Sequence, residues 1–96
     1  MLTSKQRARL RALANPMETI FQVGKAGIGE NLINQLSDAL TARELIKIRV
    51  LETAGVPAKE VAAELAAATG AECVQVVGSR VTLYRRNEKE PRINLP

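Results

Sequence analysis

The chain has 96 residues, enough for one small domain with a buried core, and its composition of 46% hydrophobic and 25% charged residues is that of a globular protein. A net charge of +4 and an isoelectric point near 9.7 favour a polyanionic partner such as nucleic acid. The absence of histidine excludes imidazole catalysis and the common zinc sites, and the single cysteine, Cys73, excludes an internal disulfide. No apolar run approaches the roughly 18 residues that a membrane span requires, so we expect a cytoplasmic protein.

The first predicted element is a basic helix that ends before Asn15-Pro16. Thr3 is suited to cap this helix, with Gln6 as its capping-box partner. Its cations form two rows with a spacing of four, which are Lys5 with Arg9 and Arg7 with Arg11. Like charges at this spacing repel one another, so the rows suggest a bound anion, although a solvated surface helix also accounts for them.

A GxxG loop, Gly24-Lys25-Ala26-Gly27, lies between a predicted strand at Ile20 to Val23 and an amphipathic helix at Ile28 to Leu40. Glycines let backbone N–H groups approach a phosphate, the N-terminus of the next helix favours negative charge, and Lys25 adds a cation. One class of single-strand RNA binders clamps the sugar-phosphate backbone with such a loop. Two glycines at this spacing also occur in ordinary turns, so the loop alone leaves both interpretations open.

In the second half of the chain, the sequence pattern predicts a strand at Glu44 to Leu51 and a helix at Pro57 to Gly70. A hairpin is predicted at Cys73 to Arg85. Within the hairpin, Gly78-Ser79 joins strands at Cys73 to Val77 and Arg80 to Arg85. From Arg86 onward the sequence has no periodicity. We therefore expect one domain over residues 1–85 and a flexible tail over residues 86–96.

The element order α-β-α-β-α-β-β predicts an α+β two-layer sandwich, in which helices pack on one face of a four-stranded mixed sheet. The other face is then open, polar and basic, with Lys47, Arg49, Gln75, Arg80, Thr82 and Tyr84 on it. Tyr84 there either stacks on a base or covers neighbouring strands. Because aromatic residues are only 2% of the chain, we expect phosphate contacts to outweigh base stacking.

Residues for catalysis are not evident in the sequence. There is no Ser-His or Cys-His pair and no phosphate-binding loop ending in GK[ST]. Glu60 and Glu64 are interpreted as the solvated face of a helix, and a small hydrolase that uses this carboxylate pair is the remaining enzymatic alternative. We expect no enzymatic activity, no metal and no cofactor.

Five segments in order along the chain resemble the YhbY-type CRM domain, named for chloroplast RNA splicing and ribosome maturation: LTSKQR at Leu2 to Arg7, GKAGI at Gly24 to Ile28, ARELIK at Ala42 to Lys47, QVVG at Gln75 to Gly78 and LYR at Leu83 to Arg85. The resemblance spans residues 2 to 85. It implies a fold similar to the C-terminal domain of bacterial translation initiation factor three, and RNA binding that involves the GxxG loop. Because stand-alone bacterial members are associated with precursors of the large ribosomal subunit, it also implies docking on structured ribosomal RNA. We expect a monomer.

Carried onto this sequence, the resemblance implies RNA contacts from Lys5, Arg7, Gly24, Lys25, Gly27, Arg43, Lys47 and Arg85. The basic rows and the polar sheet face add Arg9, Arg11, Arg49, Arg80 and Tyr84. Many members have glycine where this chain has Ala26, and a positive φ at that position would strain an alanine. The alternative function is a protein–protein interaction module whose basic face docks on an acidic partner.

Overall fold

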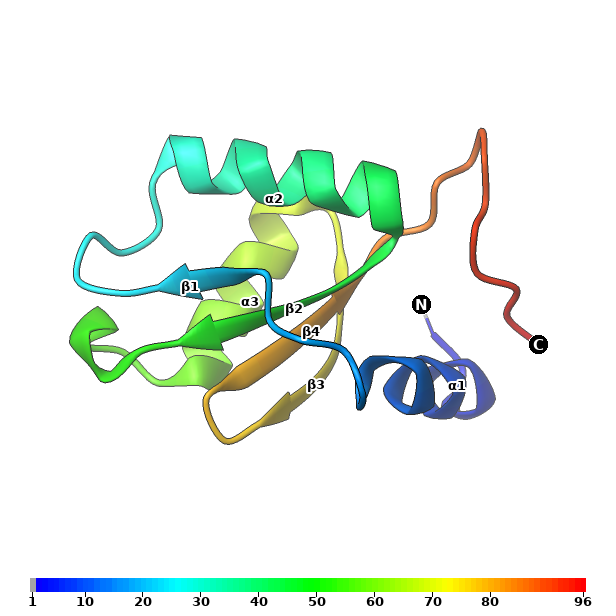
Figure 1. Ribbon diagram of the computed structural model, residues 1–96, viewed down its shortest axis with the longest axis horizontal. Helices are drawn as coiled ribbons and strands as arrows, with labels where there is room; N and C mark the ends of the chain where they lie inside the picture. The colour runs from blue at the N-terminus through cyan, green and yellow to red at the C-terminus, as the bar shows by residue number, and fades with distance from the viewer. Residues whose placement is uncertain (1) are drawn as a thin grey trace.

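The computed structural model describes residues 2–96, which form three α-helices, one short 3-10 helix and a four-stranded sheet (Figure 1). In chain order the elements are α1 (Ser4–Ala14), β1 (Phe21–Val23), α2 (Glu30–Arg43), β2 (Leu45–Val50), η1 (Glu52–Ala54), α3 (Ala58–Thr69), β3 (Glu72–Val77) and β4 (Arg80–Tyr84). The predicted α+β class and element order are confirmed. Within residues 2–96, none of the helices has the length and apolar character that crossing a bilayer demands.

The sheet has the strand order β1-β2-β4-β3 and is mixed, as predicted. β1 runs parallel to β2 because the connection between them crosses over through α2. β4 is antiparallel to both β2 and β3, and a tight turn in which Gly78 has a φ of +58° joins β3 to β4. The C-terminal ends of β1 and β2 therefore lie at the same end of the sheet as the β3–β4 turn.

The main core lies between one face of the sheet and the helices α2 and α3. It contains the apolar positions that alternate along the central strands together with the apolar stripes of both helices, including Leu36, Leu40, Ile46, Ile48, Val61, Leu65, Val81 and Leu83. This is the helix layer that the sequence predicted.

The other face of the sheet is not fully open, which corrects the expectation that all helices pack on one face. α1 lies on this second face, where Leu10 and Ala14 form a smaller core with Leu45, Val74 and Tyr84. The physical reason is that these three strand residues make an apolar patch at one end of the second face. The apolar stripe of α1 covers that patch.

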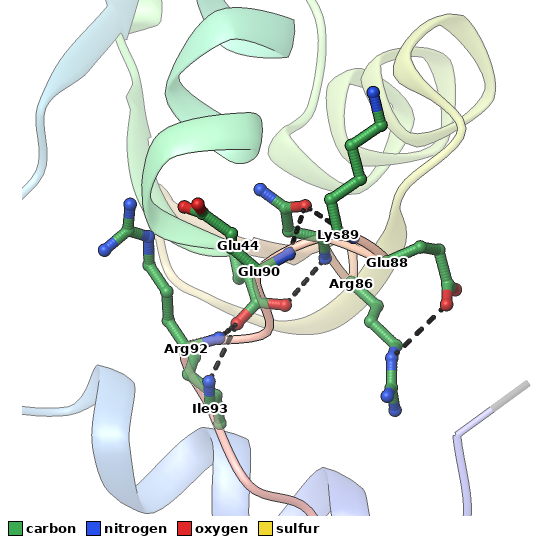
Figure 2. Close-up of polar contacts among 8 residues, drawn as sticks. Glu44, Arg86, Glu88, Lys89, Glu90, Arg92 and Ile93 are labelled. Carbon is green, nitrogen blue, oxygen red and sulfur yellow. Dashed lines mark hydrogen bonds and ion pairs between the residues drawn. The ribbon is translucent and has the colours of Figure 1, made fainter.

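The segment after β4 also differs from the predicted flexible tail, because it is held against the domain (Figure 2). Glu44, at the C-terminal end of α2, has 0% exposure, and its carboxylate accepts hydrogen bonds from the backbone N–H groups of Asn87, Arg92 and Ile93. Ile93 and Leu95 then pack against the smaller core. The segment thus completes the cover over this end of the second sheet face.

Candidate functional site

The GxxG loop is a tight turn at the tip of the β1–α2 connection. The N–H of Gly27 donates to the carbonyl of Gly24 at 2.8 Å, which leaves Lys25 and Ala26 exposed at the two central positions. Gly29 precedes α2 as its N-cap and provides no side chain to cap the helix. Glu30 in the first turn of α2 places a negative charge beside the loop, which offsets part of the attraction of this helix end for anions.

The two loop glycines are favoured for different physical reasons. Gly27 has a φ of +71°, a left-handed conformation that strains residues with a Cβ. A Cβ at Gly24 would lie 3.2 Å from Thr53 Oγ1 and 3.3 Å from Leu51 Cδ1, so this glycine lets the loop pack closely on η1. Glu44 is the one non-glycine residue with positive φ among residues 2–96, so Ala26 does not carry the strain that its position in the motif suggested.

The predicted basic rows of α1 divide into exposed and inward-facing side chains. Lys5, Arg9 and Arg11 are exposed. Arg7 is half-buried, and its guanidinium donates to the backbone carbonyls of Cys73 at 2.6 Å and Val74 at 2.8 Å. Arg7 therefore ties α1 to the edge strand β3, a role that the charge pattern did not reveal.

Two further predicted RNA contacts are also engaged within the protein. Lys47 Nζ donates to the carbonyls of Ala14, Asn15 and Met17 at 3.2–3.3 Å, which uses its three N–H groups at the C-terminal end of α1.

Arg85 joins the C-terminal ends of two helices through its guanidinium. It donates to the carbonyls of Ser37 and Thr69, both at 2.7 Å, and to the hydroxyls of Ser37 and Thr41 at 3.0 and 2.8 Å. Both Lys47 and Arg85 thus stabilise the fold through hydrogen bonds to backbone carbonyls.

Tyr84 does not offer a ring for base stacking, which corrects the interpretation of this residue as part of an open sheet face. Its side chain is only 5% exposed, in the smaller core beneath α1 and the C-terminal segment. Burial, reinforced by the negative charge of Glu44, raises the pKa of the Tyr84 phenol above its ordinary value of 10.0.

The uncovered part of the second sheet face is a row of exposed residues that crosses all four strands. Strand register aligns Gln22 with Arg49, Arg49 with Arg80, and Arg80 with Val77. Beside this row is an open cleft of about 460 Å³, lined by Asn15, Met17, Glu18, Thr19, Lys47 and Arg80. Four of these residues come from the α1–β1 connection, which the sequence analysis missed because it has neither periodicity nor a known motif.

The exposed cations do not form one compact cluster. Figure 1 shows the loop after β1 and helix α1 toward opposite ends of the longest dimension of the molecule, which is 38 Å. Arg49 and Arg80 occupy the sheet face between these ends, and Arg43 is exposed at the C-terminal end of α2. The predicted carboxylate pair, Glu60 and Glu64, is exposed on α3.

Comparisons with known proteins identify the family of this chain. The family model of the CRS1 / YhbY (CRM) domain matches residues 2–85. The Bacillus subtilis protein named "Probable RNA-binding protein YqeI" is 41% identical over 96 residues, which is 100% of both chains. A Haemophilus influenzae protein named "RNA-binding protein" is 30% identical over 95 residues, covering 99% of this chain and 95% of the relative.

A solved structure extends the similarity to the fold. The solution structure of a hypothetical Staphylococcus aureus protein, described as a candidate RNA-binding protein, superimposes with a TM-score of 0.79 at 45% identity over 100% of both chains. The family match, the full-length relatives and the shared fold agree with one another. The chain therefore belongs to the CRS1 / YhbY (CRM) domain family, an RNA-binding protein family.

Proposed function

We propose that this protein binds structured RNA without catalysing a reaction, and that its target is ribosomal RNA in a precursor of the large ribosomal subunit. The observation that carries the proposal is a set of exposed cations without an acidic partner. In the part of the chain that the structure describes, no ion pair or side-chain hydrogen bond engages Lys5, Arg9, Arg11, Lys25, Arg49 or Arg80. Such cations are free to neutralise phosphates and release counterions.

The distribution of these cations supports an extended RNA partner. They are spread along a molecule whose longest dimension is 38 Å, so different cations would contact different phosphates of one RNA. With Tyr84 buried, recognition depends on phosphates and on RNA shape more than on base stacking. The GxxG loop at one end provides the closest approach of backbone to phosphate, and the exposed face of α1 provides contacts at the other.

The proposal is tested by the salt dependence of RNA binding. Neutralising about five phosphates gives a slope of log affinity against log salt concentration of roughly −3.5 to −4.5, where the smaller magnitude applies to single strands. Filter binding to fragments of precursor large-subunit RNA measures this slope. A flat salt response would contradict the proposal.

Sedimentation of cell extracts distinguishes ribosomal RNA from an acidic protein as the partner. We expect the protein to migrate with precursors of the large subunit and to be released when ribonuclease digests the RNA. Partners that survive the digestion would instead support the protein–protein interaction module, in which the basic face docks on acidic side chains.

A further inference from the structure

Arg49 and Arg80 are cross-strand neighbours that repel one another. The β2–β4 register pairs them directly, and both side chains are exposed. Like charges directly opposite on neighbouring strands destabilise a sheet, and no acidic residue in the described part of the chain forms an ion pair with either guanidinium. A phosphate between them would remove this repulsion, because the guanidinium fork matches phosphate oxygens in a bidentate geometry.

The cleft of about 460 Å³ adjoins this arginine pair, and Arg80 belongs to both. The cleft is an open depression at the surface of the protein, and its lining is mostly polar. Asn15, Glu18 and Thr19 give it an amide, a carboxylate and a hydroxyl, and Met17 adds an apolar thioether. The polar groups can form hydrogen bonds with the edge of a base, and the thioether can pack against its flat face.

One wall of the cleft is fixed in place by the fold. Lys47 lines it, and the Nζ of this lysine is committed to three carbonyls at the end of α1. Asn15 Oδ1 also accepts a hydrogen bond from Gln75 Nε2 at 3.3 Å, which ties the α1–β1 connection to β3. A wall held in this way is preorganised, so a ligand loses little affinity to ordering it.

We propose that Arg49 and Arg80 hold one phosphate of the bound RNA and that the cleft accepts the base of the adjoining unpaired nucleotide. This inference rests on the RNA binding proposed above and goes beyond it, because it names a feature of the target. A base inside a duplex does not reach the cleft, whereas a bulged or loop nucleotide does. The site therefore selects RNA with an extruded nucleotide.

The test uses three RNA hairpins with the same stem: one fully paired, one with a single-nucleotide bulge, and one with an abasic bulge. Fluorescence anisotropy at several matched salt concentrations measures their affinities for the full-length protein. We expect about tenfold tighter binding of the bulged hairpin than of the paired one, a difference of about 1.4 kcal/mol. The abasic hairpin should lose most of this preference, since its base is missing.

Variants show whether the preference arises at this site. Arg80→Gln should abolish it, whereas Arg9→Gln, which removes an exposed cation from α1, should weaken binding to all three hairpins by the same factor. The effects of Arg49→Gln and Arg80→Gln should be less than additive in the double variant, because both side chains hold the same phosphate. Thermal unfolding verifies that each variant is folded.

The possible outcomes separate this inference from the proposed function. Equal affinity of the wild-type protein for the three hairpins, with a normal salt slope, would overturn the nucleotide site and leave RNA binding intact. Salt-independent binding to every hairpin would overturn both. Competition by a free nucleoside monophosphate at the concentrations at which bulged RNA binds would assign the cleft to a free nucleotide, and so would also overturn the inference.

Discussion

The carboxylate of Glu44 lies 2.6 Å from the backbone nitrogen of Arg92, a residue 48 positions later in the chain. The same oxygen accepts from the N–H of Ile93 at 2.8 Å, and the second oxygen accepts from the N–H of Asn87 at 2.7 Å (Figure 2). These three hydrogen bonds compensate a buried charge. They also make the C-terminal segment part of the folded domain, although the family match ends at residue 85.

Replacing Glu44 with glutamine should destabilise the protein by about 1.5–3 kcal/mol. The amide keeps one acceptor oxygen but places an NH₂ donor where the carboxylate accepts a backbone N–H. At least one buried N–H then loses its partner. Urea unfolding measures the cost, and hydrogen exchange at Asn87, Arg92 and Ile93 should become faster.

The matched control is Glu88→Gln, which changes an exposed carboxylate in the same segment that forms a surface ion pair with Arg86. Its effect should stay within about 0.5 kcal/mol. Equal stability of the two variants would show that the Glu44 hydrogen bonds do not hold the segment.

The stability of the wild-type protein should fall in acid as Glu44 becomes protonated. Burial of this carboxylate raises its pKa, but the hydrogen bonds from Asn87, Arg92 and Ile93 and the charge of Arg86 outweigh burial, so the folded-state pKa lies below the ordinary value of 4.5. A lowered pKa stabilises the fold above pH 4.5, and this contribution is lost as the pH falls through the folded-state value. Urea unfolding between pH 7 and pH 3 should show a shallower decline for Glu44→Gln than for the wild type.

Tyr84 should provide an independent signal in alkali. Burial and the nearby charge of Glu44 raise its pKa above 10.0, so the fold is stabilised below pH 10.0 and loses this contribution as the pH rises through the folded-state value. Tyr84 is the single tyrosine in the chain, so tyrosinate absorbance reports on it alone. The native protein should ionise at higher pH than the urea-unfolded protein, and coincident titrations would contradict the buried position.

Substitutions of Arg7 and Arg9 should have different effects on the stability of the protein, even though both are basic residues of α1. Arg7→Gln removes two hydrogen bonds to carbonyls of β3 and should cost about 1–2 kcal/mol. Arg9→Gln changes an exposed side chain and should stay within about 0.5 kcal/mol, while it weakens RNA binding through the lost charge. Urea unfolding and filter binding of the same two variants test this division, and equal stabilities would contradict the structural role of Arg7.

The fold was predictable where local patterns determine it. Alternation in β2 and the helical spacing of Leu36 and Leu40 specify which side chains face the main core. The position of α1 was not predictable in the same way. Its apolar stripe of Leu10 and Ala14 indicates that this side of the helix is buried, but not which part of the protein it packs against. The patch that receives it combines Leu45, Val74 and Tyr84 from three different strands.

The candidate site was predictable in its residue types but not in their individual roles. Lys47 and Arg85 were predicted as RNA contacts, both from the family resemblance and Lys47 also from strand alternation. Their side chains instead donate to backbone carbonyls, which carry no sequence signal. The C-terminal segment was predicted to be a flexible tail for a similar reason, because it is held by backbone N–H groups that donate to Glu44. The GxxG turn, in contrast, was visible because its glycine spacing is a local pattern, and Gly27 has the positive φ that favours glycine. The close approach of Gly24 to Leu51 and Thr53 is long-range and was not predictable from the motif.

The GxxG loop and the first turn of α2 should have opposite electrostatic effects on RNA binding. Lys25→Ala removes an exposed cation from the turn, and it should weaken binding by a similar factor for all RNA sequences and reduce the magnitude of the salt slope by about 1. Glu30→Gln removes the negative charge beside the loop and should strengthen binding. Filter binding over a range of salt concentrations measures both, and high salt should diminish both effects because it screens exposed charges. If Glu30→Gln weakens binding or Lys25→Ala leaves it unchanged, the phosphate does not approach this loop, and the contacts must lie on α1 and the sheet face.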